Sequence, residues 1–172
     1  MKLQTLDDLL EQQLQELYGM EQRLTKALPE MASASSSGPL RDAFEHHAEQ
    51  TRGHVRNIEE VFRALARRPE SIEVGGIVGV TGEAQSIVGA IEPSPLRDAA
   101  LIGAARKVEH YEIAAYSAVI SIVRKLALTE VAILLERNLQ EETTTDKRLA
   151  EIADTAVTPE VLQLGAHQRG PA

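Results

Sequence analysis

The sequence contains no cysteine among its 172 residues, so neither a disulfide bond nor a thiolate metal site can form. It also lacks an excess of basic charge, because 18 lysine and arginine residues stand against 26 acidic residues, a formal net charge of −8. Without a basic block, neither a nucleic acid nor an anionic membrane surface is an expected partner. Any bound metal ion would have to be held by carboxylates, imidazoles, carbonyl groups or water.

Long hydrophobic runs are missing as well. The most apolar stretch, from Ile72 to Ile91, contains Glu73 and Glu83 and is too broken to cross a bilayer. The first fifteen residues are acidic and amphipathic, unlike a secretory signal, in which a basic start precedes an apolar core. We therefore expect a soluble cytoplasmic protein, whose length fits a single domain with its own core.

Four long stretches have helical periodicity, and no alternating strand pattern competes with them. Thr5, followed three residues later by Asp8, has the capping-box pattern of a helix start. Pro39 and Pro95 stand at first-turn positions, where proline is tolerated, whereas Pro29 predicts a kink or an early last turn. The expected helices cover about residues 6–34, 39–66, 95–127 and 129–156.

The lengths of the connections indicate the topology. Short turns join the first helix to the second and the third to the fourth, so each pair is expected to be antiparallel. About thirty residues separate the second helix from the third, and they hold only a short apolar helix near residues 80–91. Such a crossover is typical of ferritin-like bundles. We therefore predict an all-α, ferritin-like four-helix bundle over residues 1–157, followed by a flexible tail over residues 158–172.

The inward-facing stripes of the expected helices carry ionisable residues. On the first helix, Glu21 interrupts a seam of leucine and methionine side chains that recur every three or four residues. His47 and His54 lie on the apolar stripe of the second helix. All of these positions fall near mid-helix once each helix pair is folded at its turn. The third and fourth helices add inward acids at Glu109, Glu112, Glu142 and Asp146.

Burying several carboxylates has a high cost in free energy. Each uncompensated carboxylate costs several kcal/mol, whereas a whole domain is stable by about 5–15 kcal/mol. The acids must be protonated, paired with basic residues or neutralised by cations, unless part of the set lies on a solvated helix face. Arg106 is the one basic residue expected near the interior, and one guanidinium cannot neutralise them all. A metal site, with two ions, is the simplest solution.

Four segments of the chain resemble the YciE/YciF-type proteins of the ferritin-like superfamily, and together they extend over nearly the whole chain to about Ala156. Lys107–Tyr116 is the most specific part of the resemblance. It implies a four-helix ferritin-like bundle, a homodimer, a carboxylate-rich dinuclear site and a link with bacterial stress responses that lacks an agreed reaction. The four segments read ELYGMEQRLTKALPEMA, FEHHAEQTRGHV, DAALIGAARKVEHYEIAAYSA and LQEETTTDKRLAEIA.

The resemblance also implies a set of metal ligands. Glu21 matches the ligand of the first helix, and His47 that of the second, where Gln50 stands in place of an expected glutamate. The Glu-x-x-His pattern of the wider ferritin-like template does not occur in this sequence. This departure argues against standard di-iron oxygen chemistry. The ligands implied on the third and fourth helices are Glu109, Glu112, Glu142 and Asp146.

Two functions follow as hypotheses. Oxygen and imidazole donors suit iron or manganese, so the first is a metal-binding stress protein with redox activity toward oxygen or peroxide. The second is a non-enzymatic structural bundle that retains the acids without turnover, so the sequence leaves open whether the protein is an enzyme. Tyr18, Tyr111 and Tyr116 lie near the implied ligands, either as packing residues or as hydrogen-bond donors to a ligand carboxylate.

Overall fold

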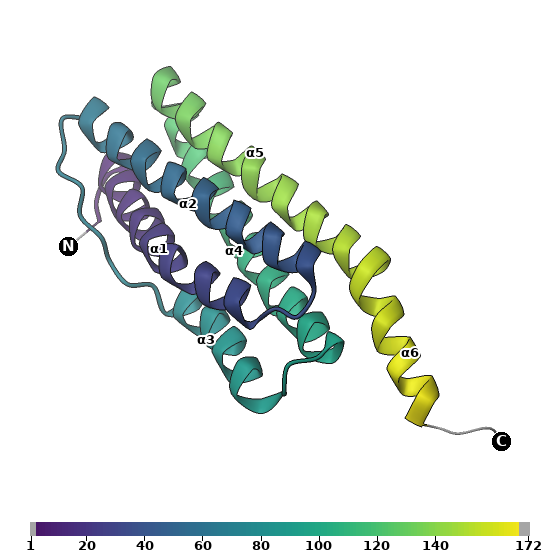
Figure 1. Ribbon diagram of the computed structural model, residues 1–172. Helices are drawn as coiled ribbons and strands as arrows, with labels where there is room; N and C mark the ends of the chain where they lie inside the picture. Colours follow the sequence, from purple (N-terminus) through teal and green to yellow (C-terminus); the bar gives the residue numbers. More distant parts are fainter. Residues whose placement is uncertain (1–2, 169–172) are drawn as a thin grey trace.

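The computed structural model describes residues 3–168, and no strand occurs among them. Four long helices form the bundle, in which α1 pairs with α2 and α4 with α5, while α2 also packs on α5 and α1 on α4 (Figure 1). This is the predicted ferritin-like four-helix bundle. Its helices are α1 (Leu6–Ala34), α2 (Gly38–Ala64), α4 (Pro95–Lys125) and α5 (Thr129–Ile152).

The start of α1 follows the predicted capping box. The Thr5 hydroxyl accepts a hydrogen bond from the backbone N–H of Asp8 at 3.1 Å, and the Asp8 carboxylate accepts one from the backbone N–H of Thr5 at 2.9 Å. The helix then continues through Pro29 to Ala34, the predicted end, so of the two effects considered for the proline the early last turn does not occur. Burial of Met31 and Ala32 in the core explains why the helix continues past the proline.

The long crossover carries α3 (Gly75–Ala90), which begins earlier than the predicted start at Val80. Before α3 the chain runs along α1, where the backbone N–H of Ile72 donates to the carbonyl of Gln15 at 3.2 Å. α3 itself packs on α4 and α1. Figure 1 shows it on the side of the bundle away from α5. The crossover therefore covers the α1–α4 side of the bundle and leaves the α2–α5 side uncovered.

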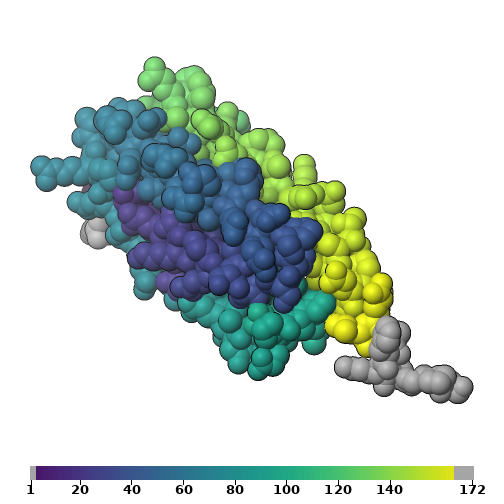
Figure 2. All heavy atoms as spheres, in the orientation of Figure 1, coloured from purple at the N-terminus to yellow at the C-terminus, as the bar shows by residue number. Residues whose placement is uncertain are grey.

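The chain continues as helix where the sequence predicted a flexible tail. After α5 comes a π-helical turn, Ala153–Val157, and then α6 (Thr158–Gln168). Val157 is buried and Val161 packs against the core, so apolar contacts hold the first part of α6 in place. Figure 2 shows this helix, in yellow, at one end of the bundle. Residues 169–172 of the predicted tail lie outside the described residues.

No helix in the described part of the chain is both long enough and apolar enough to span a membrane.

We predict that Gly19→Ala destabilises the protein by about 1–3 kcal/mol, because overpacking at a backbone contact forces the chain to move. A Cβ at Gly19 would lie 2.3 Å from the carbonyl oxygen of Ile72. Gly103→Ala in α4 is the matched control, since nothing lies within 4 Å of its added Cβ. It should raise stability by up to about 1 kcal/mol. Urea unfolding checks both values, and equal stability of Gly19→Ala and the wild type would contradict the prediction.

Candidate metal centre

Six ionisable side chains from all four long helices are buried at the middle of the bundle, each 1% exposed or less. Three- and four-residue spacings along each helix turn these positions toward the common axis, as the hydrophobic stripes do. The six residues are Glu21 of α1, His47 and His54 of α2, Glu109 and Glu112 of α4, and Glu142 of α5.

The six side chains form two groups that share one carboxylate. Glu142 belongs to both groups. Within each group, one nitrogen or oxygen atom per residue lies within 4.8 Å of the others. The structure therefore brings together two adjacent positions, each of which could hold a metal ion. The larger group consists of His47, Glu109, Glu112 and Glu142, and the smaller group of Glu21, His54 and Glu142.

The two imidazoles lie among carboxylate oxygens from other helices. His47 Nε2 is 3.3 Å from an oxygen of Glu109 and 3.3 Å from an oxygen of Glu142. His54 Nδ1 is 2.8 Å from Glu142 Oε1 and 3.5 Å from Glu21 Oε2. These nitrogens nevertheless have no partner with hydrogen-bond geometry among the described residues. Close approach without a directed hydrogen bond suits donor atoms that converge on a cation between them.

Eight nitrogen and oxygen atoms of this centre are buried without a hydrogen-bond partner among the described residues. An unpaired buried polar atom is costly, and a buried charge costs more unless it is paired or holds a metal. The donor set, carboxylate oxygen and imidazole nitrogen, therefore fits a divalent cation. The atoms are Glu21 Oε2, His47 Nε2, His54 Nδ1, Glu109 Oε2, both carboxylate oxygens of Glu112 and both of Glu142.

The pKa values of the histidines show how the centre balances its charge in the absence of a cation. Burial lowers the pKa of His47, but Glu109 and Glu142 outweigh burial and raise it to about 9. Burial likewise lowers the pKa of His54, and its approach to Glu142 and Glu21 raises it to about 11. Both imidazoles are therefore protonated at neutral pH and offset part of the carboxylate charge.

The pKa values of two carboxyl groups of the centre are raised as well. Burial, followed by repulsion from Glu142, Glu21 and Glu109, raises the pKa of Glu112 well above its usual value. Burial also raises the pKa of Glu142 to about 7, against the lowering effect of the two histidines. The centre thus retains protons that an unfolded chain would release.

A chain of hydrogen bonds through Tyr116, Asn138 and Asn57 fixes one carboxylate oxygen of Glu21. The buried Tyr116 hydroxyl donates to Glu21 Oε1, and the side-chain amide of Asn138 donates to Tyr116 Oη at 3.0 Å. Asn57 in turn donates to Asn138 Oδ1 at 2.7 Å. Tyr116 thus takes the hydrogen-bonding role considered for the tyrosines, whereas the Tyr18 hydroxyl donates to Glu59 at 2.8 Å. Sequence reasoning missed Asn138, although it lies one helical turn before Glu142 on the same stripe.

Two of the implied ligands lie away from the two groups. Asp146 accepts hydrogen bonds from Arg106 at 2.8 and 3.3 Å and lies 3.4 Å from His110, so it is paired at the half-exposed α4–α5 surface. The structure therefore corrects the expectation for Asp146, because an arginine of the facing helix holds it there. Gln50 is half-buried and lines surface pockets between α2 and α5, and its Oε1 has no partner among the described residues.

The family described as "Domain of unknown function (DUF892)" matches residues 5–162. Over 154 residues the chain is 35% identical to Protein YciF of Escherichia coli strain K12. The aligned part covers 89% of this chain and 93% of that protein. The crystal structure of the E. coli stress protein YciF matches with a TM-score of 0.87 at 34% identity, over 91% of this chain and 99% of that one.

Two further solved structures are similar. The YcfI protein of Rhodopseudomonas palustris has a TM-score of 0.84 and 33% identity, covering 87% of this chain and 95% of that one. A protein of Xanthomonas campestris, with a TM-score of 0.71 over 93% of this chain and 97% of that one, is 22% identical and shares the fold. The resemblance to YciF-type proteins inferred from the sequence is thus confirmed.

We predict that the chelator-treated protein loses stability as the pH rises from about 5 to 9. A histidine with a raised native pKa stabilises the fold below its unfolded value of 6.5 and loses that contribution as the pH rises through the native pKa. Glu142 acts with the same sign, because its raised pKa means that the native state binds the proton more tightly. Urea unfolding at pH 5, 7 and 9 measures the trend, and stability that rises over this range would contradict it.

Proposed function

This chain belongs to the DUF892 family, and we propose that it binds two iron or manganese ions at the carboxylate–histidine centre of its helical bundle. The observation that carries the proposal is the convergence, in two groups that share Glu142, of eight buried donor atoms without a hydrogen-bond partner among the described residues. These atoms are shielded from water, and the ion-pair contacts of the carboxylates within the described part of the chain are made with His47 and His54. Cations between them would remove the cost of burying the carboxylates.

Each residue has a defined part in the proposed centre. His47, Glu109 and Glu112 would hold one ion, Glu21 and His54 would hold the other, and Glu142 would contribute to both positions. Iron and manganese accept this mixture of carboxylate and imidazole donors. When bound, such ions supply redox chemistry with oxygen or peroxide.

Neighbouring groups orient these ligands. Tyr116 fixes Glu21 Oε1 by its hydroxyl and leaves Glu21 Oε2 directed toward His54. The Thr145 hydroxyl lies 3.3 Å from Nδ1 of His47, which directs Nε2 of the same ring toward the acids. Such partners fix the orientation of ligand side chains and tune their basicity.

The number of carboxylates and imidazoles supports metal binding, whereas their distribution over the helices differs from that of known di-metal bundles. Four carboxylates and two imidazoles equal the set that ferritin-like di-metal proteins use. In that template each imidazole follows a glutamate on its own helix, whereas here both imidazoles lie on α2. This redistribution favours a second candidate function, a bundle that keeps its ions as a structural element without turnover. By similarity to the stress protein YciF, we propose a role in a stress response for either case. The homodimer expected from the sequence resemblance is the proposed assembly.

We predict that the chelator-treated protein binds two Fe²⁺ or Mn²⁺ ions per chain. At a free ion concentration of 100 times Kd, each ion that binds the native state stabilises it by about 2.7 kcal/mol, which raises the Tm. Equilibrium dialysis with elemental analysis measures the ions, and thermal unfolding measures the shift. Consumption of oxygen or peroxide by the loaded protein then separates a redox enzyme from a structural metalloprotein.

Two variants sharpen this experiment. Glu142→Gln should lower occupancy at both positions, because Glu142 belongs to both groups. Asp146→Asn is the matched control on the same helix and should keep both ions, because Asp146 pairs with Arg106 outside the groups. If the wild type holds no ion and its Tm does not change, or if Asp146→Asn loses the ions while Glu142→Gln keeps them, the proposed centre is wrong.

A further inference from the structure

His54 connects the buried centre with the surface of the bundle. Its Nδ1 lies against Glu142 and Glu21, while its Nε2 lies 2.9 Å from Glu141 Oε2. The Glu141 side chain is 27% exposed, in contrast to the buried carboxylates of the centre, which are 1% exposed or less. Glu141 is therefore an acid that reaches both solvent and a residue of the centre.

A polar groove between α2 and α5 leads to this residue. One part has a volume of about 330 Å³ and is lined by residues that include His54, Glu141 and Asn57. An adjoining part of about 480 Å³ shares His46 and Gln50 with the first. The groove thus touches the centre at His54 directly, and it touches the hydrogen-bond chain behind Glu21 at Asn57. It offers carboxylate, amide and imidazole groups to a hydrated ion, and Arg56, Arg137 and Arg148 line it as well.

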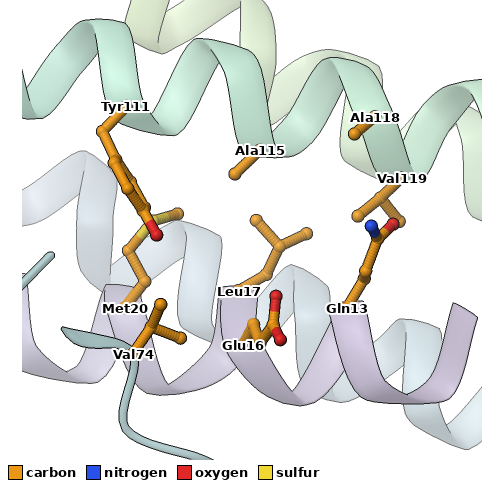
Figure 3. Close-up of a pocket in the computed structure, with 9 residues that line it drawn as sticks. All are labelled: Gln13, Glu16, Leu17, Met20, Val74, Tyr111, Ala115, Ala118 and Val119. Atoms are coloured by element: carbon orange, nitrogen blue, oxygen red, sulfur yellow. The ribbon is translucent and has the colours of Figure 1, made fainter. Parts of the chain in front are cut away.

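The opposite side of the bundle is far less suitable for a cation. A cavity of about 50 Å³ lies there between α1 and α4. Figure 3 shows Leu17, Met20 and Val119 around it, with the polar groups of Gln13 and Glu16 beside them. The crossover segment and α3 cover this side of the bundle. A cation that passed there would lose its water against apolar side chains, which is unfavourable.

A glycine in the middle of α2 keeps the polar groove open. Gly53 lines the groove, although glycine destabilises a helix interior relative to alanine. Packing does not require a glycine there, because the nearest atom to an added Cβ would be Arg56 Nη2 at 3.7 Å, an ordinary contact. Its effect is instead to leave bare backbone beside His54 and Glu141.

We infer that divalent cations reach the buried centre through the α2–α5 groove, and that Glu141 receives them at the surface and passes them to His54. The inference rests on the proposed metal binding. The two oxygens of Glu141 are divided between the interior and the exterior, since Oε2 faces His54 and Oε1 lies 3.5 Å from Nε of Arg137. Arg137 is 71% exposed and competes with an arriving cation for Glu141. Glu141 is thus a residue of the access route, while the permanent ligands are the six buried side chains.

The test measures the rate at which the chelator-treated, full-length protein takes up Co²⁺ alone, whose visible absorption changes when nitrogen and oxygen ligands replace water. Stopped-flow mixing gives the rate, and dialysis gives the final occupancy. Glu141→Gln should slow uptake at least tenfold and leave the final occupancy unchanged. Arg137→Gln should speed uptake at least twofold, because it frees Glu141. Glu136→Gln, another arginine-paired acid of α5, is the matched control and should keep the wild-type rate.

A second pair of variants tests the route itself. Gly53→Leu fills the α2–α5 groove and should slow uptake at least fivefold, whereas Ala118→Leu fills the α1–α4 cavity and should not change the rate. Circular dichroism verifies that each variant is folded. Slow uptake by Ala118→Leu together with normal uptake by Gly53→Leu would overturn the inference.

Two further outcomes separate this inference from the proposed function. Wild-type speed in Glu141→Gln overturns the access route while metal binding stands, and a lost final occupancy in that variant makes Glu141 a permanent ligand, which also overturns it. If the wild type takes up no Co²⁺ at all, metal binding itself fails, and the access route fails with it.

Discussion

The structure depends on the burial of four carboxylates beside two imidazoles in the dry middle of a helical bundle. Each of these acids, left uncompensated, would cost several kcal/mol, which is a large part of a typical domain stability of about 5–15 kcal/mol. Protonated His47 and His54 offset part of the charge, as their pKa values of about 9 and 11 indicate. Eight donor atoms nevertheless have no hydrogen-bond partner among the described residues. Cation binding would remove the remaining cost of burying these groups, and carboxylate oxygens with imidazole nitrogens are donors that suit a divalent cation.

The rest of the bundle can be understood as support for this centre. On one side the crossover lies so close to α1 that only glycine fits at position 19, and α3 completes the cover. On the other side a Cβ at Gly53 would make only an ordinary contact, with Arg56 Nη2 at 3.7 Å, and the polar groove is lined by His54 and Glu141. Two glycines within helices thus have opposite effects, because one permits close packing and the other leaves an opening. The bundle is consequently closed by apolar groups toward α3 and accessible through polar groups between α2 and α5.

The sequence predicted much of this arrangement, because a buried acid interrupts the apolar stripe of its helix and can be recognised from the spacing. Glu21 stands out within a stripe of leucines. The capping box at Thr5 predicted the first residue of α1 correctly. Asp146 has the right period and yet pairs with Arg106, because the small rotation of α5 that decides between the interior and the α4–α5 surface cannot be derived from spacing alone. Asn138 was missed because burial of a neutral amide does not carry the cost of a buried charge. The role proposed for Glu141 could not be predicted because it depends on His54, the residue of α2 that lies against it. The helix after Thr158 was missed because its contacts to the bundle are made over a long sequence distance.

The central claim is that cations occupy the space between the carboxylates of separate helices, and anomalous X-ray scattering from crystals grown with Mn²⁺ tests it most directly. The account predicts two strong manganese peaks in the bundle interior on either side of Glu142, one beside His47, Glu109 and Glu112 and the other beside Glu21 and His54. Crystals that show no interior peak at saturating Mn²⁺, with the same carboxylates satisfied by protons and by one another, would contradict it.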